Sequence, residues 1–214
     1  MNQFISDKKV MLFDFDGTLV DTMGVYQEFV RSILSEYPDI DLDKAMIAYL
    51  ETSGLPFSQQ LRMIFPEKND LFWDEVNKKF EEKKIKMLES VTLNVGVEDA
   101  LVKLKHDGKK LALSSSTKQA LVDRTFSKYA DLFDLVLGFR EPSFGKGAAH
   151  FGEVMKYFAV GPSEIVFIGD SLKDQSIARD FNVPFIAKIG TFSRERFLAV
   201  DSDVQCIDSI SDLD

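Results

Sequence analysis

Cysteine is nearly absent from the 214-residue sequence: a single residue, Cys206, excludes an internal disulfide framework and a metal site built from several cysteines. Apolar runs of bilayer-spanning length are missing, and the amino-terminal residues lack the long apolar segment of a signal peptide. There is no internal repeat and no low-complexity segment. We therefore expect a cytoplasmic protein with no membrane contact.

Basic residues are scarcer than acidic ones, with 26 Lys and Arg against 35 Asp and Glu, and the net charge is −9. A surface of this sign repels nucleic acid overall, so no nucleic-acid partner is expected. A small anion that is held by a metal ion and one or two lysines remains compatible with this net charge. The length suits one sizeable domain, or one domain with a smaller insert.

The stretch on which the other observations depend is residues 10–22, Val-Met-Leu-Phe-Asp-Phe-Asp-Gly-Thr-Leu-Val-Asp-Thr. It begins as an apolar run typical of a short buried strand and ends at Gly17, where the chain can turn sharply. Asp14 and Asp16 lie at the strand's carboxyl end, and alternate strand residues share a face. A buried acidic pair is costly unless a divalent cation offsets its charge. A polar strand end fraying into solvent would explain the Asp-x-Asp pattern equally well.

Two different patterns follow this strand. The first is a block of predicted helices without a clear strand, at residues 23–37, 41–52, 57–65 and about 69–89. The second alternates predicted helices, at 96–106, 118–129, 147–158 and 172–181, with predicted strands, at 110–114, 135–139, 164–168 and 184–187. This alternation is typical of βαβ units around a parallel sheet. We predict an α/β fold: a doubly wound, Rossmann-like core of residues 1–22 and 90–214 with an all-helical insert at 23–89.

Polar side chains gather at the carboxyl ends of the predicted strands, where such sheets bind their ligands. There are four clusters: Asp14 with Asp16, Ser114–Ser116, Lys146, and Asp170 with Asp174. Several carboxylates with one lysine and a hydroxyl suit a Mg²⁺ site that accepts a phosphate group. One carboxylate can attack phosphorus, while a second protonates the leaving group and then activates water.

Each cluster also has an ordinary structural explanation. Residues 114–117 can cap the next helix, Lys146 can be an exposed loop lysine, Asp170 can be a helix cap, and Asp174 can be a solvated residue in a first helical turn. The predicted site would be absent only if all four of these explanations were true at once. Their shared placement at strand ends argues against that.

Four ordered features of this sequence resemble the motifs of the haloacid dehalogenase superfamily. They are Asp14-Phe-Asp-Gly-Thr-Leu-Val, a serine after a strand, a lysine, and Gly169-Asp-Ser-Leu-Lys-Asp. The match runs from Val10 to about Ile189. The chain is most similar to the branch containing phosphoglycolate phosphatases and β-phosphoglucomutases. The resemblance implies that residues 23–89 form a helical cap and that Mg²⁺ is the cofactor.

The resemblance also implies a role for each of the acidic residues. Asp14 would be the nucleophile and a Mg²⁺ ligand. Asp16 would be the general acid and base, and would bind Mg²⁺ through its backbone carbonyl. Asp170 would bind the metal directly, and Asp174 directly or through water.

The phosphate would be held by hydroxyls and the lysine. Ser115 is preferred over its neighbours because the family's hydroxyl usually follows a four-residue strand such as 111–114. Ser116 is the second candidate, and Ser114 is not excluded. Lys146 would bind phosphate and steady the nucleophile, although the family commonly has proline where this sequence has Gly147.

In the cap, the loop around Gly54 and Phe57 occupies the place where this branch often carries substrate-selecting residues. The loop offers no lysine or arginine of its own, and Arg62 is the nearest basic residue. These three residues are the candidate substrate contacts, but they do not identify a substrate.

Together these features predict a Mg²⁺-dependent phosphatase that hydrolyses a small phosphorylated metabolite through an aspartyl phosphate, as a monomer or weak dimer. A β-phosphoglucomutase-like phosphomutase is the alternative. Dehalogenases and phosphonatases of the superfamily lack an acid at the position of Asp16. A phospho-receiver domain would have consecutive acids and no helical insert, and a silent binding protein would be expected to lose Asp14 or Asp170.

Overall fold

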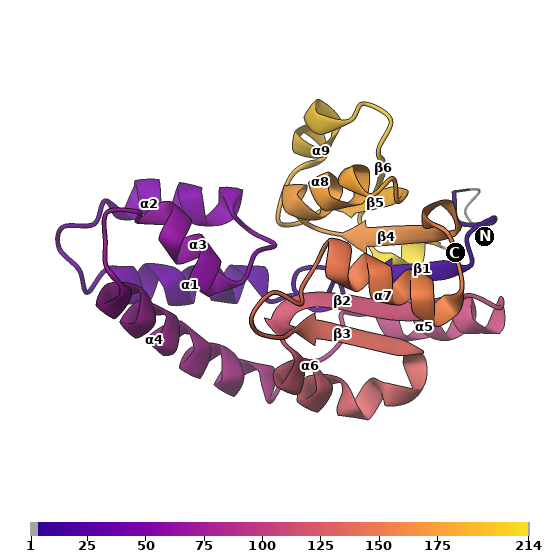
Figure 1. The fold of residues 1–214 in the computed structure, drawn as a ribbon, viewed down its shortest axis with the longest axis horizontal. Coiled ribbons are helices and arrows are strands. Elements are labelled where there is room, and N and C mark those ends of the chain that lie inside the picture. The colour runs from indigo at the N-terminus through magenta and orange to yellow at the C-terminus, as the bar shows by residue number, and fades with distance from the viewer. Residues whose placement is uncertain (1–3, 214) are drawn as a thin grey trace. The chain divides into compact units, whose positions relative to one another are not determined.

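The computed structural model describes residues 4–213, and the larger of its two compact units contains one parallel sheet in the strand order β3-β2-β1-β4-β5-β6 (Figure 1). The strands are β1 (Val10–Phe13), β2 (Lys110–Lys118), β3 (Leu135–Phe139), β4 (Ile165–Gly169), β5 (Phe185–Lys188) and β6 (Gln205–Ile207). The predicted α/β fold with a parallel sheet is confirmed.

Strand β1 lies in the interior of the sheet and pairs with β2 on one side and β4 on the other. Its four residues, Val-Met-Leu-Phe, are all fully buried. A continuous apolar run is what a strand covered on both faces requires. The position of β1 places the residues that follow it at the middle of the sheet's carboxyl edge.

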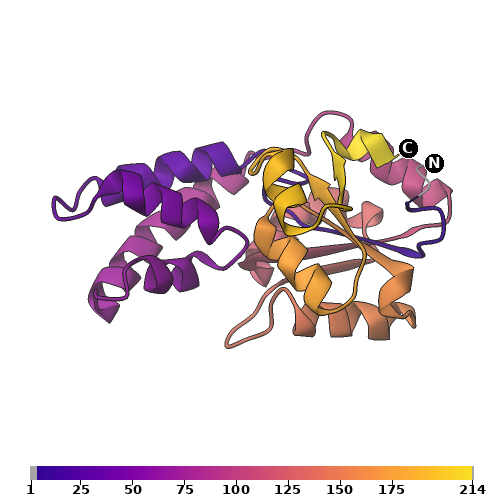
Figure 2. The ribbon, with the colours of Figure 1, turned by 90° about the horizontal axis from the view of Figure 1, so that it is seen from above.

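Helices cover this sheet on both faces. They are α5 (Val97–His106), α6 (Gln119–Phe126), α7 (Ala148–Phe158), α8 (Leu172–Asp180) and α9 (Arg194–Val200), with short 3-10 helices η1 (Ser127–Leu132), η2 (Pro162–Glu164) and η3 (Ile210–Leu213). Phe151 of α7 and Ile177 of α8 pack on one face in a cluster with Leu12 and Phe167. Helix α5 and η3 lie on the opposite side of the sheet from α7 (Figure 2).

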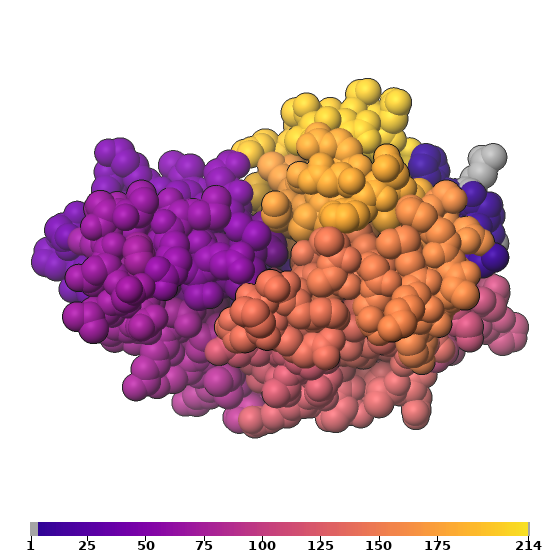
Figure 3. Space-filling view, in the orientation of Figure 1, coloured from indigo at the N-terminus to yellow at the C-terminus, as the bar shows by residue number. Residues whose placement is uncertain are grey.

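Residues Thr22–Val91 form a separate compact unit with four helices: α1 (Met23–Leu34), α2 (Leu42–Glu51), α3 (Phe57–Ile64) and α4 (Asp70–Leu88). Asp41 caps α2 by accepting a hydrogen bond from the Lys44 amide, and Asn69 caps α4 through the Phe72 amide. The unit has its own core, in which the rings of Phe57 and Phe80 lie 4.1 Å apart. Its helices pack into a continuous surface (Figure 3). That this unit acts as a cap stays a prediction.

Several predicted boundaries differ from the structure; helix α1, for example, ends at Leu34 and not at residue 37. Strand β2 does not end at Ser114 but continues to Lys118, with a break in its register against β3 between these two residues. The hydroxyl of Ser114 and that of Thr117 both have hydrogen-bond partners there, which offsets the weak strand preference of serine. The predicted helix 118–129 is shorter, and η1 follows it.

The carboxyl-terminal elements α9, β6 and η3 are not predicted by the sequence patterns, because they have seven, three and four residues and therefore show little periodicity. Across residues 4–213, every helix is too short or too polar to cross a bilayer.

Candidate active site

The predicted site residues of the α/β unit lie where its central strands end. Asp14 follows β1, and its amide donates a hydrogen bond to the carbonyl of Ile168 in β4. Asp170 directly follows β4, while Ser115 belongs to the carboxyl end of β2. The parallel pairing of β2, β1 and β4 therefore brings these three positions to one edge of the sheet.

Three carboxylates converge at this edge. Oxygen atoms of Asp14, Asp170 and Asp174 all lie within 4.8 Å of one another, and each residue is at most 3% exposed. Burial raises the pKa of Asp14 well above its ordinary value, and burial together with the charge of Asp174 raises the pKa of Asp170 to about 6. Ionised carboxylates at this spacing repel one another in a buried site, so the group calls for positive charge.

Lys146 supplies part of that charge. Its Nζ lies 2.5 Å from Asp14 Oδ1 and 2.9 Å from Asp174 Oδ1, and its side chain is only 5% exposed. Burial acts to lower the pKa of Lys146, but the two carboxylates outweigh it and raise the pKa above its ordinary value. The interpretation of Lys146 as an exposed loop lysine is therefore wrong.

With all four side chains ionised, three carboxylates and one ammonium sum to two negative charges. Oxygen-only donors with this excess charge fit a hard divalent cation. The side chains of Asp14, Asp170 and Asp174 could hold it, and the backbone carbonyl of Asp16 stays a predicted further ligand.

Asp174 is positioned by the start of helix α8. Ser171 is the N-cap: its Oγ accepts a hydrogen bond from the Asp174 amide and donates one of 2.6 Å to Asp174 Oδ2. A Cβ atom at Gly169 would lie 2.9 Å from Asp174 Cβ, so a glycine is needed for this approach. The alternative in which Asp170 caps the helix is wrong, because Ser171 does so.

Asp170 is held by two threonines that are far from it in the sequence. Thr191, in the loop after β5, donates a short hydrogen bond to Asp170 Oδ2. Thr18 lies between the carboxylates, with its Oγ1 3.4 Å from Asp14 Oδ2 and 3.5 Å from Asp170 Oδ1. Sequence reasoning missed Thr191; its place just beyond a predicted strand, as for the other clusters, was the available signal.

The carboxylate of Asp16 lies outside the group of three and has a different partner. Its Oδ2 accepts a 2.9 Å hydrogen bond from Thr117 Oγ1, across 101 positions of sequence. The turn that places it depends on Gly17, whose φ is +79° and whose amide donates to the carbonyl of Val20. Thr117 was considered only as a possible helix cap, but no side chain caps α6, and Thr117 instead orients Asp16.

The three candidate serines differ in their hydrogen bonds. Ser114 Oγ lies 2.8 Å from Nδ1 of His150, so this hydroxyl is engaged inside the protein. Ser115 Oγ accepts a hydrogen bond from the Thr117 amide and keeps its own proton to donate. Ser116 is half-buried. The roles of Ser115 and Ser116 as donors to an anion stay predictions.

Gly147 explains the departure from the lysine-proline pattern. Its φ is +102°, a conformation that a proline, with φ near −65°, cannot adopt. The turn from Lys146 into α7 therefore needs a glycine at this position, and it delivers the lysine to Asp14 and Asp174.

The candidate substrate residues belong to the helical unit and make contacts within it. Phe57 is buried against Tyr49 and Phe80. Arg62 pairs with Asp70 at 3.0 Å and stacks on Trp73. Gly54 takes a φ of +98° in the loop before α3. Their roles in substrate choice stay predictions.

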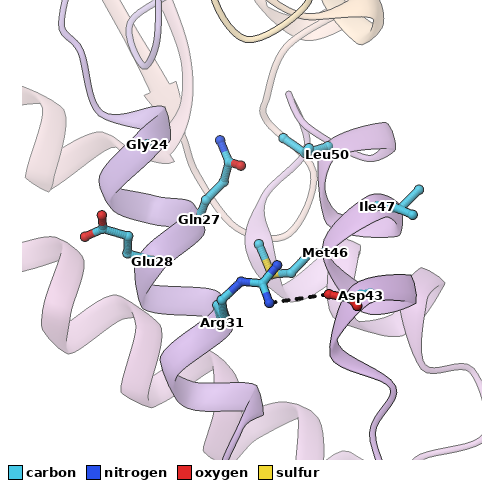
Figure 4. A pocket seen from close by; sticks show the side chains of 8 residues that line it. All are labelled: Gly24, Gln27, Glu28, Arg31, Asp43, Met46, Ile47 and Leu50. Atoms are coloured by element: carbon cyan, nitrogen blue, oxygen red, sulfur yellow. Dashed lines mark ion pairs between the residues drawn. The ribbon is translucent and has the colours of Figure 1, made fainter.

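A groove of about 490 Å³ lies between α1 and α2 of this unit (Figure 4). Met46, Ile47 and Leu50 give it an apolar side, and Arg31 faces Asp43 across it at 3.5 Å. Gly54, Phe57 and Arg62 do not line this groove.

Comparison with known proteins shows the family to which the chain belongs. The model of the haloacid dehalogenase-like hydrolases matches residues 11–188. A phosphoglycolate phosphatase of Psychrobacter arcticus is 26% identical over 198 residues, covering 83% of this chain and 81% of the relative. A phosphorylated carbohydrates phosphatase of Thermotoga maritima is 27% identical over 183 residues, with 82% of each chain covered.

Solved structures share the fold. CbbY of Rhodobacter sphaeroides, in complex with phosphate, superposes with a TM-score of 0.74 at 19% identity, covering 96% of both chains. The family model spans the segment that carries Asp14, Lys146 and Asp170, and the two relatives are both phosphatases. The chain therefore belongs to the haloacid dehalogenase-like hydrolase family, in its phosphoglycolate phosphatase-like branch, and is an enzyme of the phosphatase class.

Proposed function

We propose that the protein is a Mg²⁺-dependent phosphatase that hydrolyses a small phosphorylated metabolite through a phosphorylated Asp14. The observation that carries this proposal is the buried group of three carboxylates beside Lys146, which has more acidic groups than one lysine can neutralise. A purely structural ion pair would need one carboxylate for one lysine.

Asp14, Asp170 and Asp174 would hold Mg²⁺, since their carboxylates offer the hard oxygen ligands that this ion prefers. Bound there, the ion would neutralise the excess charge and withdraw electron density from the phosphoryl oxygens. The remaining chemistry belongs to the side chains of this chain.

In the first step, a carboxylate oxygen of Asp14 attacks phosphorus and the bond from phosphorus to the ester oxygen breaks. Asp16 donates a proton to that oxygen, so the leaving group departs as a neutral alcohol. In the second step Asp16 takes a proton from water, the hydroxide attacks phosphorus, and Asp14 is released with inorganic phosphate.

The other residues bind and orient. Lys146 contacts Asp14 Oδ1, and the nucleophile would be Oδ2, which lies 3.4 Å from Thr18 Oγ1. Ser115 and Ser116 would donate hydrogen bonds to the phosphoryl oxygens. Thr117 fixes Asp16 through a 2.9 Å hydrogen bond. Such fixed placement is the main protein contribution to phosphoryl transfer.

For the substrate we propose a small phosphorylated carbohydrate or a phosphorylated small acid. The support comes from the two relatives, named for phosphoglycolate and for phosphorylated carbohydrates. The net charge of −9 disfavours a polyanion but permits a small anion that binds at one locally compensated site.

The test is phosphate release from a generic aryl phosphate and from a panel of small sugar phosphates and phosphoglycolate. Each is assayed with Mg²⁺, with EDTA, and with Mg²⁺ restored. We expect turnover that EDTA removes and Mg²⁺ restores. Turnover that is unchanged in EDTA, or no release from any compound, would contradict the proposal.

A further inference from the structure

His150 is a buried ionisable side chain that the proposed chemistry does not use. It lies in the first turn of α7 and is fully inaccessible to solvent. Its Nδ1 is 2.8 Å from Ser114 Oγ, and its Nε2 is 3.2 Å from the carbonyl oxygen of Gly138. One imidazole thus connects strand β2, strand β3 and helix α7.

The partners determine the form of the ring. The Gly138 carbonyl can only accept a hydrogen bond, so Nε2 carries the proton. Burial lowers the pKa of His150 to about 4, and the positive charges of Lys146 and Arg140 act in the same direction. The ring is therefore neutral near pH 7, and Nδ1 accepts the hydrogen bond that Ser114 donates.

The two segments that His150 joins carry the phosphate-binding candidates. On one side, Ser114 directly precedes Ser115. On the other, the His150 amide donates a 3.3 Å hydrogen bond to the carbonyl of Gly145, which closes the turn containing Lys146. The ring centroid of Phe144, in the loop before that turn, lies 4.9 Å from the imidazole centroid.

We propose that His150 is a positioning residue of the phosphate site: it holds the end of β2 against the start of α7, and so fixes the spacing between Ser115 and Lys146. His150 itself touches neither substrate nor reacting atoms. The proposal rests on the proposed function, because it assumes that these two side chains bind the same phosphoryl group.

Three variants and a control test it. His150→Phe keeps a ring but removes both hydrogen bonds, Ser114→Ala removes one of them, and the double variant removes both groups. The control is Thr125→Val, which deletes a buried hydroxyl that donates to Leu121 in α6. For each protein we would measure kcat, KM, the inhibition constant of inorganic phosphate in Mg²⁺, and the thermal midpoint.

For His150→Phe we expect a phosphate inhibition constant about tenfold higher and a kcat/KM lower by about ten- to a hundredfold, as for a displaced binding group. Ser114→Ala should also raise the phosphate inhibition constant and lower kcat/KM, but by smaller factors than His150→Phe. The double variant should match His150→Phe, because both substitutions break the same contact. Thr125→Val should lower the thermal midpoint only.

A purely structural role would lower the thermal midpoint of the variants and leave kcat, KM and the phosphate constant at parental values, which would overturn the proposal. If His150→Phe does not fold, a parental phosphate constant in Ser114→Ala overturns it equally. If the parent neither releases nor binds phosphate, the proposed function fails first and the positioning role falls with it.

Discussion

The ammonium nitrogen of Lys146 lies 2.5 Å from a carboxylate oxygen of Asp14, and both side chains are 5% exposed. The pair joins the turn before α7 to the end of the central strand. Lys146 does not neutralise the whole group, because the carboxylates of Asp170 and Asp174 lie close to that of Asp14.

Replacing the lysine should damage both stability and turnover. Lys146→Met leaves the buried carboxylates without their ammonium, and removing one partner of a buried pair typically costs about 3–5 kcal/mol. We expect a loss of that order in the free energy of unfolding without Mg²⁺, and at least a hundredfold loss of kcat/KM. Urea unfolding and phosphate release measure the two effects.

The control is Lys156→Met, which changes an exposed lysine of helix α7. It should behave like the parent in both assays. Parental stability and activity in Lys146→Met would contradict the importance of the ion pair.

Metal binding should be visible without any substrate. Mg²⁺ added to the apo protein should raise its thermal midpoint, since a ligand that binds only the folded state stabilises it. Asp170→Asn should reduce this rise strongly, because one of three carboxylates is lost. Asp180→Asn, at the exposed end of α8, should leave it unchanged. Equal rises in all three proteins would place the ion elsewhere.

His150 should contribute a pH dependence of stability with a defined sign. Its folded pKa of about 4 lies below the ordinary value of 6.5, so between these two pH values the unfolded chain binds the extra proton. This contribution is fully present above pH 6.5 and is lost as the pH falls toward 4, by about 3 kcal/mol in total.

Other groups titrate in the same range, and the raised pKa of Asp170 acts with the opposite sign. The quantity to measure is therefore the difference in unfolding free energy between the parent and His150→Phe, from pH 7 to pH 4. This difference should shrink as the pH falls. A difference that stays constant would show that His150 is not buried in its neutral form.

The helical unit should depend on Phe57. Its ring packs against Phe80 at 4.1 Å, and truncation of a buried phenylalanine costs about 3–5 kcal/mol. Phe57→Ala should therefore lower the stability of residues 22–91. A role of this loop in substrate choice is better tested with Leu55→Ala, a half-buried neighbour.

We expect Leu55→Ala to change the ratio of kcat/KM between a small aryl phosphate and the best natural substrate, while stability stays near the parental value. Equal activity losses on both substrates, or none, would remove the loop from substrate choice. If the thermal midpoint of Phe57→Ala equals that of the parent, the contact between Phe57 and Phe80 does not stabilise the helical unit.

Much of the core was predictable because its signals are local. The alternation of apolar strands and helices indicated the parallel sheet, and Asp14, Lys146, Asp170 and Asp174 stood out because each lies beyond a predicted strand. The structure brings these four side chains together. Parallel pairing accounts for Asp14 and Asp170, since it aligns the carboxyl ends of neighbouring strands, whereas Asp174 and Lys146 also depend on the start of α8 and on the turn before α7.

The supporting contacts were not predictable, because they join residues that are remote in sequence. Thr117 reaches Asp16 across 101 positions, and Thr191 reaches Asp170 across 21. The buried bond between Ser114 and His150 depends on how α7 packs against β2. Some of these residues lie beyond predicted strands, but no local pattern identifies their partners, which become clear only in three dimensions.

The central claim is that Asp14 is the residue that becomes phosphorylated. The most direct measurement is the rate of phosphate release by Asp14→Asn compared with the parent, on the best substrate and with saturating Mg²⁺. The amide keeps the size of the side chain but is a poor nucleophile, so we expect no measurable turnover from a protein that remains folded. Release within about tenfold of the parent, equivalent to only about 1.4 kcal/mol of barrier, would contradict the assignment.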